Sequence, residues 1–286
     1  MAALGAEQAG SVEARFRGLA EGPEERIDLA EGALLIAKHA DEDLDVERYL
    51  ARIDELAARL RARIPQGGTE PERIAALNRF LFAEQGFAPN AEDYYDPRNS
   101  FLNQVLDRRV GIPISLSVLY IEVGRRVGLP LRGVAFPGHF LVKCDLGAGV
   151  VVLDPYCGGI SLGLQDLQRR LREVRGGEVS RAIVAGMLVA ANKKEILARM
   201  LRNLKAIYLQ QHDYAHALPT LDWILLLRPG EVAELRDRGL TYHKLECVRA
   251  ALSDLERYLE KAPAAADRDE IRSRVIELRR SAARLN

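Results

Sequence analysis

The chain has 286 residues, and its 41 lysines and arginines balance 41 aspartates and glutamates, so its formal net charge is zero. This balance argues against nucleic-acid and membrane partners, and no stretch reaches the roughly 18 apolar residues of a membrane span. Three cysteines at no metal-ligand spacing argue against disulfides and a zinc site, so we expect a cytoplasmic protein without metal or cofactor.

The N-terminal region is predicted to be helical after a flexible tail that covers residues 1–22. A first helix is expected to begin at Pro23, and a second, amphipathic helix follows from Val46, with apolar residues at steps of three and four. Thr69 and Glu72 form the capping-box pattern that begins a third helix. We expect Gly86 to end that helix.

The middle of the chain differs in kind, because a buried helix is followed by strands. Pro113 suits the first turn of a helix, and residues 114–123 are apolar almost all round. Gly128 is expected to end this helix. Valine, leucine and phenylalanine then recur in three short segments, which predict antiparallel strands over residues 131–136, 139–146 and 150–155.

The rest of the chain is predicted to be mainly helical. Helix returns after Leu162, and the arginine run of Arg169, Arg170 and Arg172 is interpreted as a solvated helix face. Residues 182–194 are ambiguous between a strand and the start of a helix. A charged helix over residues 267–285 is expected to cap the C-terminal end of a helix stack.

Two C-terminal stretches line up with each other at a shift of 34 residues. Leu201, Tyr208, Ala217, Leu221 and Pro229 correspond in this way to Leu235, Tyr242, Ala251, Leu255 and Pro263. This period, with a tyrosine, a small residue and a closing proline, is the tetratricopeptide pattern. Such repeats stack helix pairs into a surface that holds other protein segments, so the pattern predicts a protein or peptide partner.

A buried helix followed by strands that carry a histidine and then an aspartate resembles the transglutaminase-like branch of papain-type folds. That resemblance implies a cysteine nucleophile at the start of the helix, activated by His139, which Asp154 orients. In this chain Pro113 occupies the position of the nucleophile. We therefore interpret His139 and Asp154 as a vestigial catalytic pair, and we expect their side chains to form a hydrogen bond.

The stretch from Asn99 to Lys143, followed by the Asp154-Pro-Tyr-Cys-Gly-Gly segment and the repeats, resembles the SirB family of bacterial proteins. The likeness covers about residues 25–265. It implies a transglutaminase-like domain coupled to a tetratricopeptide domain, and it implies no settled reaction.

Several residues are alternative site candidates. Ser115 and Cys157 are possible replacement nucleophiles, although Ser115 lies about 200° around the helix from Pro113 and Cys157 lacks a helix N-terminus. Gln104 is a cleft amide in one interpretation. Trp223 falls off the core positions of the repeats, which makes it a candidate for an exposed partner-binding residue.

These patterns predict an α+β protein with a tail (1–22), a transglutaminase-like domain with a short antiparallel sheet (23–190) and a tetratricopeptide domain with a capping helix (191–286). The favoured hypothesis is a non-catalytic regulatory or scaffold protein that binds a protein or peptide. The alternative is an amide hydrolase or acyltransferase that uses His139 and Asp154 with an unusual nucleophile.

Overall fold

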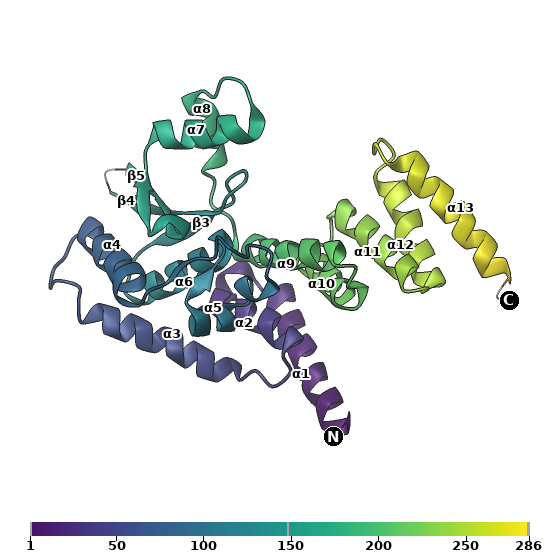
Figure 1. The fold of residues 1–286 in the computed structure, drawn as a ribbon, viewed down its shortest axis with the longest axis horizontal. Helices are drawn as coiled ribbons and strands as arrows, with labels where there is room; N and C mark the ends of the chain where they lie inside the picture. Colours follow the sequence, from purple (N-terminus) through teal and green to yellow (C-terminus); the bar gives the residue numbers. More distant parts are fainter. Residues whose placement is uncertain (1, 148, 285–286) are drawn as a thin grey trace. The chain divides into compact units, whose positions relative to one another are not determined.

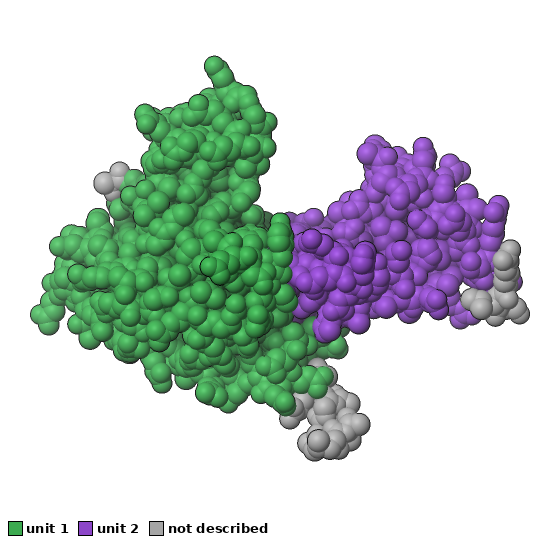
Figure 2. All heavy atoms as spheres, viewed as in Figure 1, with its two compact units in different colours: residues 1–200 green, residues 201–286 purple. Residues whose placement is uncertain are grey.

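The computed structural model describes residues 2–147 and 149–284, and its chain divides into two compact units. Unit 1 comprises residues 1–200 and unit 2 residues 201–286 (Figure 2). Helix α9 (Lys193–Gln210) contains the limit between them. The fold is α+β, as predicted, because unit 1 combines helices with small sheets and unit 2 is helical (Figure 1).

The N-terminal part of unit 1 is helical from its beginning, which differs from the expected flexible tail. Helix α1 (Ala2–Glu21) presents Val12, Phe16 and Ala20 as buried side chains, and this four-residue spacing gives the helix an apolar face. Residues 2–21 are thus helical rather than irregular, while residue 1 lies outside the described residues.

The next helical elements of unit 1 follow α1 directly along the chain. They are η1 (Glu24–Arg26), α2 (Leu29–Ala40), α3 (Val46–Arg61) and α4 (Glu70–Asn78). The predicted capping box begins α4, since the Glu72 carboxylate accepts a hydrogen bond of 2.8 Å from the Thr69 backbone N–H. A π-helix, η2 (Arg79–Glu84), continues α4, and Gly86 follows it with a left-handed φ of 75°.

Helix α6 (Pro113–Arg126) forms the centre of unit 1. All of its residues from Pro113 to Gly124 are buried, as the apolar pattern predicted. The elements before it are η3 (Pro97–Asn99), α5 (Leu102–Arg108) and a short parallel pair of strands, β1 (Ala88–Pro89) and β2 (Val110–Gly111). These two-residue strands were not predicted, because they are too short to show an alternating pattern.

The main sheet of unit 1 is antiparallel and has the order β3-β4-β5-β6. Its strands are β3 (Leu131–Val134), β4 (Leu141–Leu146), β5 (Gly149–Asp154) and β6 (Ile160–Leu162), with η4 (Pro155–Cys157) between the last two. The first three match the predicted strands, and β6 adds a fourth. Helices α7 (Leu164–Arg175) and α8 (Arg181–Met187) pack on this sheet through Leu167, Leu171 and Val184 (Figure 1).

Unit 2 consists of the C-terminal part of α9 followed by four helices. These are α10 (Tyr214–Leu227), α11 (Val232–Lys244), α12 (Val248–Lys261) and α13 (Arg268–Arg284). The predicted small positions Ala217 and Ala251 are fully buried, as are Leu221 and Leu255. Helix α13 joins the core of α12 through Ile271, Val275 and Leu278, in agreement with its predicted capping role.

The domain limits predicted at residues 22/23 and 190/191 remain predictions. The compact units divide ten residues later than the second of these limits, at Met200/Leu201. Within the residues that the structure describes, none of the helices is long and apolar enough to cross a membrane.

Candidate functional site

The candidate site gathers side chains from the segments that flank the main sheet. His139 lies in the turn between β3 and β4, two residues before β4 begins, rather than on the strand where it was predicted. Asp154 is the last residue of β5 and leads into η4. Arg170 comes from α7, and Arg199 from the part of α9 that belongs to unit 1.

His139 and Asp154 form the predicted hydrogen bond, with 2.9 Å between Nε2 of the histidine and Oδ1 of the aspartate. The same carboxylate oxygen accepts hydrogen bonds from the backbone N–H groups of Tyr156, at 3.1 Å, and of Cys157, at 3.3 Å. Arg170 Nη2 lies 2.7 Å from the other oxygen, Oδ2. The fully buried carboxylate thus holds together the β3–β4 turn, η4 and α7.

The electrostatic surroundings keep Asp154 ionised at neutral pH. Burial alone would raise the pKa of this carboxyl, but the hydrogen bond and charge of His139, followed by those of Arg170, outweigh it and lower the pKa to about 2. An ionised carboxylate can only accept, so Nε2 of His139 carries a hydrogen. In the neutral ring, Nδ1 is therefore the nitrogen with a free lone pair, which is the geometry of an oriented base.

Further contacts fix the histidine from its other sides. Arg199 Nη2 donates a hydrogen bond of 2.9 Å to the backbone carbonyl of His139, and its guanidinium lies 5.5 Å from the centre of the Phe140 ring. The Tyr156 ring meets the imidazole edge to face at 5.8 Å. These contacts set the position of the imidazole, so the pair is preorganised whether or not it takes part in a reaction.

Pro113, at the nucleophile position, is the first residue of α6 and is buried. Ser115, the first alternative, is also fully buried, and its hydroxyl donates a hydrogen bond of 2.6 Å to the carbonyl of Asn99. The Ser115 oxygen in turn accepts a hydrogen bond of 3.1 Å from the Ile112 N–H. The serine therefore fastens the segment before α6 to the start of the helix, and its proton is committed to a backbone acceptor.

Cys157, the second alternative, is exposed in η4 beside Asp154. Burial and then the negative charge of Asp154 raise the pKa of its thiol above the ordinary value of 9.0. This direction is opposite to that of reactive cysteines, whose surroundings stabilise the thiolate. Cys144 is buried on β4, where burial likewise raises the pKa of its thiol.

The remaining predicted residues lie outside the cluster around His139. Gln104 is half-buried on α5, and no contact with His139 or Asp154 brings it into the cluster. Trp223 lies on α10 with only 5% of its surface exposed, so the expectation of an exposed partner-binding tryptophan is wrong.

Sequence reasoning missed the role of Arg170. The arginine run was interpreted as a solvated face, and that interpretation is wrong for Arg170, whose side chain is 23% exposed and paired with Asp154. A signal was present, because Arg170 follows the buried Leu167 by one helical turn and therefore borders the buried face of α7. Tyr156 and Arg199 were also missed: Tyr156 belongs to the Asp154-Pro-Tyr-Cys-Gly-Gly segment but was given no role, and Arg199 stands in no motif.

The comparisons with known proteins agree with this architecture. A model of the transglutaminase-like superfamily matches residues 47–202, and a tetratricopeptide repeat model matches residues 204–275. The chain is 42% identical over 265 residues to a UPF0162 protein of Xylella fastidiosa, which covers 92% of this chain and 94% of that protein. It is 32% identical over 238 residues to a UPF0162 protein of Vibrio cholerae, covering 83% and 87% of the two chains.

A more distant likeness concerns part of the chain. F-box only protein 21 of Mus musculus is 33% identical over 179 residues, which is 60% of this chain and 28% of that protein. No solved structure matches the chain. By its fold and by the superfamily match, the chain has a transglutaminase-like domain joined to tetratricopeptide repeats.

The chain belongs to the UPF0162 family of the transglutaminase-like superfamily. The domain pairing implied by the resemblance to SirB proteins is confirmed, whereas the SirB name itself is not.

Proposed function

We propose that this protein is a non-catalytic binding protein, in which the transglutaminase-like unit lacks a nucleophile and the tetratricopeptide unit presents a surface to a protein or peptide partner. The observation that carries the proposal is the buried proline at the start of α6, where the superfamily layout calls for a cysteine. Covalent acyl transfer needs an activated nucleophile within reach of a base, and a proline side chain has none to offer.

The environments of the alternative nucleophiles support the same proposal. The Ser115 hydroxyl is buried and donates to a backbone carbonyl, so attack on a substrate would first require that bond to break. The thiol of Cys157 has a raised pKa and is therefore less ionised at neutral pH than an ordinary cysteine. His139 and Asp154 then serve to hold the loops of this unit in place.

The ion pairs of unit 2 support a preformed binding surface. Lys205 on α9 contacts Glu234 and Asp237 on α11 at 2.7 and 2.8 Å, and Arg238 on α11 contacts Asp254 on α12 at 2.6 Å. Partly buried contacts between consecutive helices fix their spacing, which is what a repeat surface needs to recognise a partner. We further propose a cytoplasmic location, in keeping with the free thiols of Cys144, Cys157 and Cys247.

The test is the reactivity of Cys157 towards thiol-directed and acylating probes, measured by mass spectrometry of the full chain. We expect Cys157 to react no faster than Cys247, an exposed thiol in unit 2 that serves as the internal control. We also expect the His139→Ala variant to leave the rate at Cys157 unchanged. Rapid labelling of Cys157 that disappears in His139→Ala would identify an activated nucleophile and overturn the proposal.

A further inference from the structure

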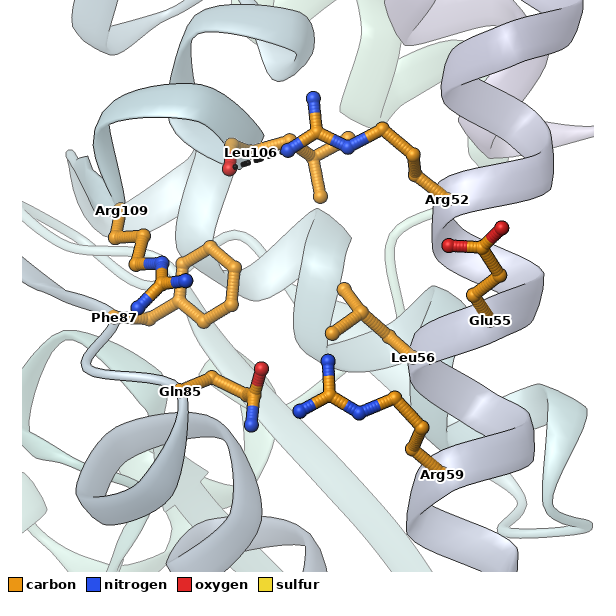
Figure 3. A pocket seen from close by; sticks show the side chains of 8 residues that line it. All are labelled: Arg52, Glu55, Leu56, Arg59, Gln85, Phe87, Leu106 and Arg109. Carbon is orange, nitrogen blue, oxygen red and sulfur yellow. Dashed lines mark hydrogen bonds between the residues drawn. The ribbon is translucent and has the colours of Figure 1, made fainter.

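A second site of unit 1 lies between α3, the segment after η2 and the end of α5, and it shares no residue with the cluster around His139. It is a cavity of about 110 Å³ (Figure 3). Its eight lining residues are Arg52, Glu55, Leu56, Arg59, Gln85, Phe87, Leu106 and Arg109. We call it the arginine pocket, because Arg52, Arg59 and Arg109 supply its positive charge.

The three arginines reach the pocket from two walls. Arg52 and Arg59 lie about two turns apart on α3 and so share one face of that helix. Arg109 comes from the opposite wall, at the C-terminal end of α5, with a left-handed φ of 59°. This backbone conformation is unfavourable for residues other than glycine or asparagine. The hydrogen bond of 2.8 Å from the Ala88 N–H to the Arg109 carbonyl holds the backbone of Arg109 in it.

The pocket carries positive charge that the protein itself does not neutralise. Arg52 is paired with Asp107 and donates a hydrogen bond of 3.1 Å to the Leu106 carbonyl, so its side chain is fixed. Among the described residues, neither Arg59 nor Arg109 forms an ion pair. Glu55 is the one acidic residue among the eight that line the pocket, so with Arg52 paired to Asp107 a single carboxylate faces Arg59 and Arg109.

Gln85 adds an uncharged hydrogen-bonding group to the wall of the arginine pocket. Only 7% of its surface is exposed, and among the described residues none forms a hydrogen bond with its side-chain amide. Figure 3 shows this amide on the same side of the pocket as the guanidinium of Arg59 in that view. Because this amide opens onto the cavity, it is free to bond a ligand there in place of water.

We propose that the arginine pocket binds a phosphate group, either as inorganic phosphate or as a small phosphomonoester. Guanidinium groups arriving from two walls, together with an amide N–H, suit an oxyanion with several acceptor oxygens, whereas a carboxylate has only two. The buried Phe87, Leu56 and Leu106 supply apolar walls that restrict water around the anion. The volume of about 110 Å³ is below the roughly 300–1,000 Å³ of drug-sized ligand sites, so the ligand is smaller than a nucleotide.

The test is isothermal titration calorimetry of the full chain with inorganic phosphate and with glycerol 3-phosphate, at constant ionic strength. We expect saturable binding, weakened roughly tenfold or more in Arg59→Gln and in Arg109→Gln. Arg48→Gln is the matched control, because Arg48 is an exposed arginine of the same helix that does not line the pocket, and its affinity should be unchanged. Tighter binding of one of the two probes identifies the form in which the phosphate is recognised.

Two outcomes would overturn the inference. One is the absence of saturable binding for both probes, and the other is equal binding by the wild type and the Arg59→Gln/Arg109→Gln double variant. Acetate is titrated in parallel, and binding of acetate as tight as that of phosphate would contradict the phosphate assignment. Circular dichroism of each variant establishes that a lost affinity does not come from a lost fold.

Discussion

Replacing Asp154 with asparagine tests whether this carboxylate holds the loops of the candidate site together. The pKa of Asp154 is lowered from 3.8 to about 2, because His139 and Arg170 outweigh the opposing effect of burial. Since one pKa unit corresponds to about 1.4 kcal/mol, the ionised carboxylate contributes about 2 kcal/mol to the free energy of unfolding at neutral pH. The substitution also removes the ion pair with Arg170, so we expect a loss of about 2–4 kcal/mol at pH 7.

The pH dependence of stability provides the sharper measurement. The folded-state pKa lies below the unfolded value, so the stabilisation is fully present above about pH 4 and is lost as the pH falls through about 2. Wild-type protein should therefore lose stability across this window more steeply than Asp154→Asn. The local stability is measured by hydrogen–deuterium exchange of peptides from β4 and β5 in increasing urea, at pH 7, 4 and 3. The exchange rates are corrected for the pH dependence of the intrinsic amide exchange rates.

Asp145→Asn is the matched control, because Asp145 lies on β4 and pairs with Arg132 at the surface. An exposed ion pair contributes less than about 1 kcal/mol, so this variant should stay close to the wild type. The reasoning is refuted if Asp154→Asn loses no more stability than Asp145→Asn at pH 7. Identical pH dependence in the wild type and Asp154→Asn would refute it equally.

Two further predictions concern packing and buried charge. Ala217→Leu should lower the free energy of unfolding of unit 2 by about 1–3 kcal/mol, because it overpacks a fully buried small position, whereas Ala215→Leu at an exposed position of the same helix should change it little. Urea unfolding followed by the fluorescence of Trp223, on this helix, measures both variants. Glu122→Gln should lower the stability of unit 1 by about 3 kcal/mol, because this buried carboxylate lies 2.5 Å from Arg126 and 2.9 Å from Arg125. Hydrogen–deuterium exchange of α6 measures the loss, and a loss no larger than that caused by Glu173→Gln, at an exposed position, would contradict the prediction.

The sequence predicted those features that local patterns determine. The helix that begins at Pro113 shows its burial in the sequence because residues 114–123 are apolar almost all round, and a helix with so little polar surface has to be covered on nearly every side. The three long strands of the sheet carry runs of valine and leucine between turn residues. The hydrogen bond between His139 and Asp154 was expected from the resemblance to the transglutaminase-like layout, and the structure contains it.

The features that the sequence did not predict depend on contacts between distant segments. The partner of Arg170 is the end of a strand, and nothing in a run of arginines indicates which one turns inward. Helix α1 was expected to be a tail because its residues form no continuous apolar stretch, although Val12, Phe16 and Ala20 recur at steps of four. The arginine pocket is assembled from three separated segments, so no local pattern contains it.

The geometry around Asp154 shows what the His139–Asp154 pair does in a protein without a nucleophile at the start of α6. The carboxylate accepts two backbone N–H groups that begin η4, one ring N–H from the β3–β4 turn and the charge of Arg170 on α7. The same carboxylate oxygens of Asp154 therefore both orient His139 and attach these three segments to one another. A buried carboxylate that lost these partners would have to protonate or leave the interior, and its loss would free all three segments at once. Attachment of these segments is therefore a role that needs no catalysis, and catalysis would need a nucleophile at the start of α6, where Pro113 stands.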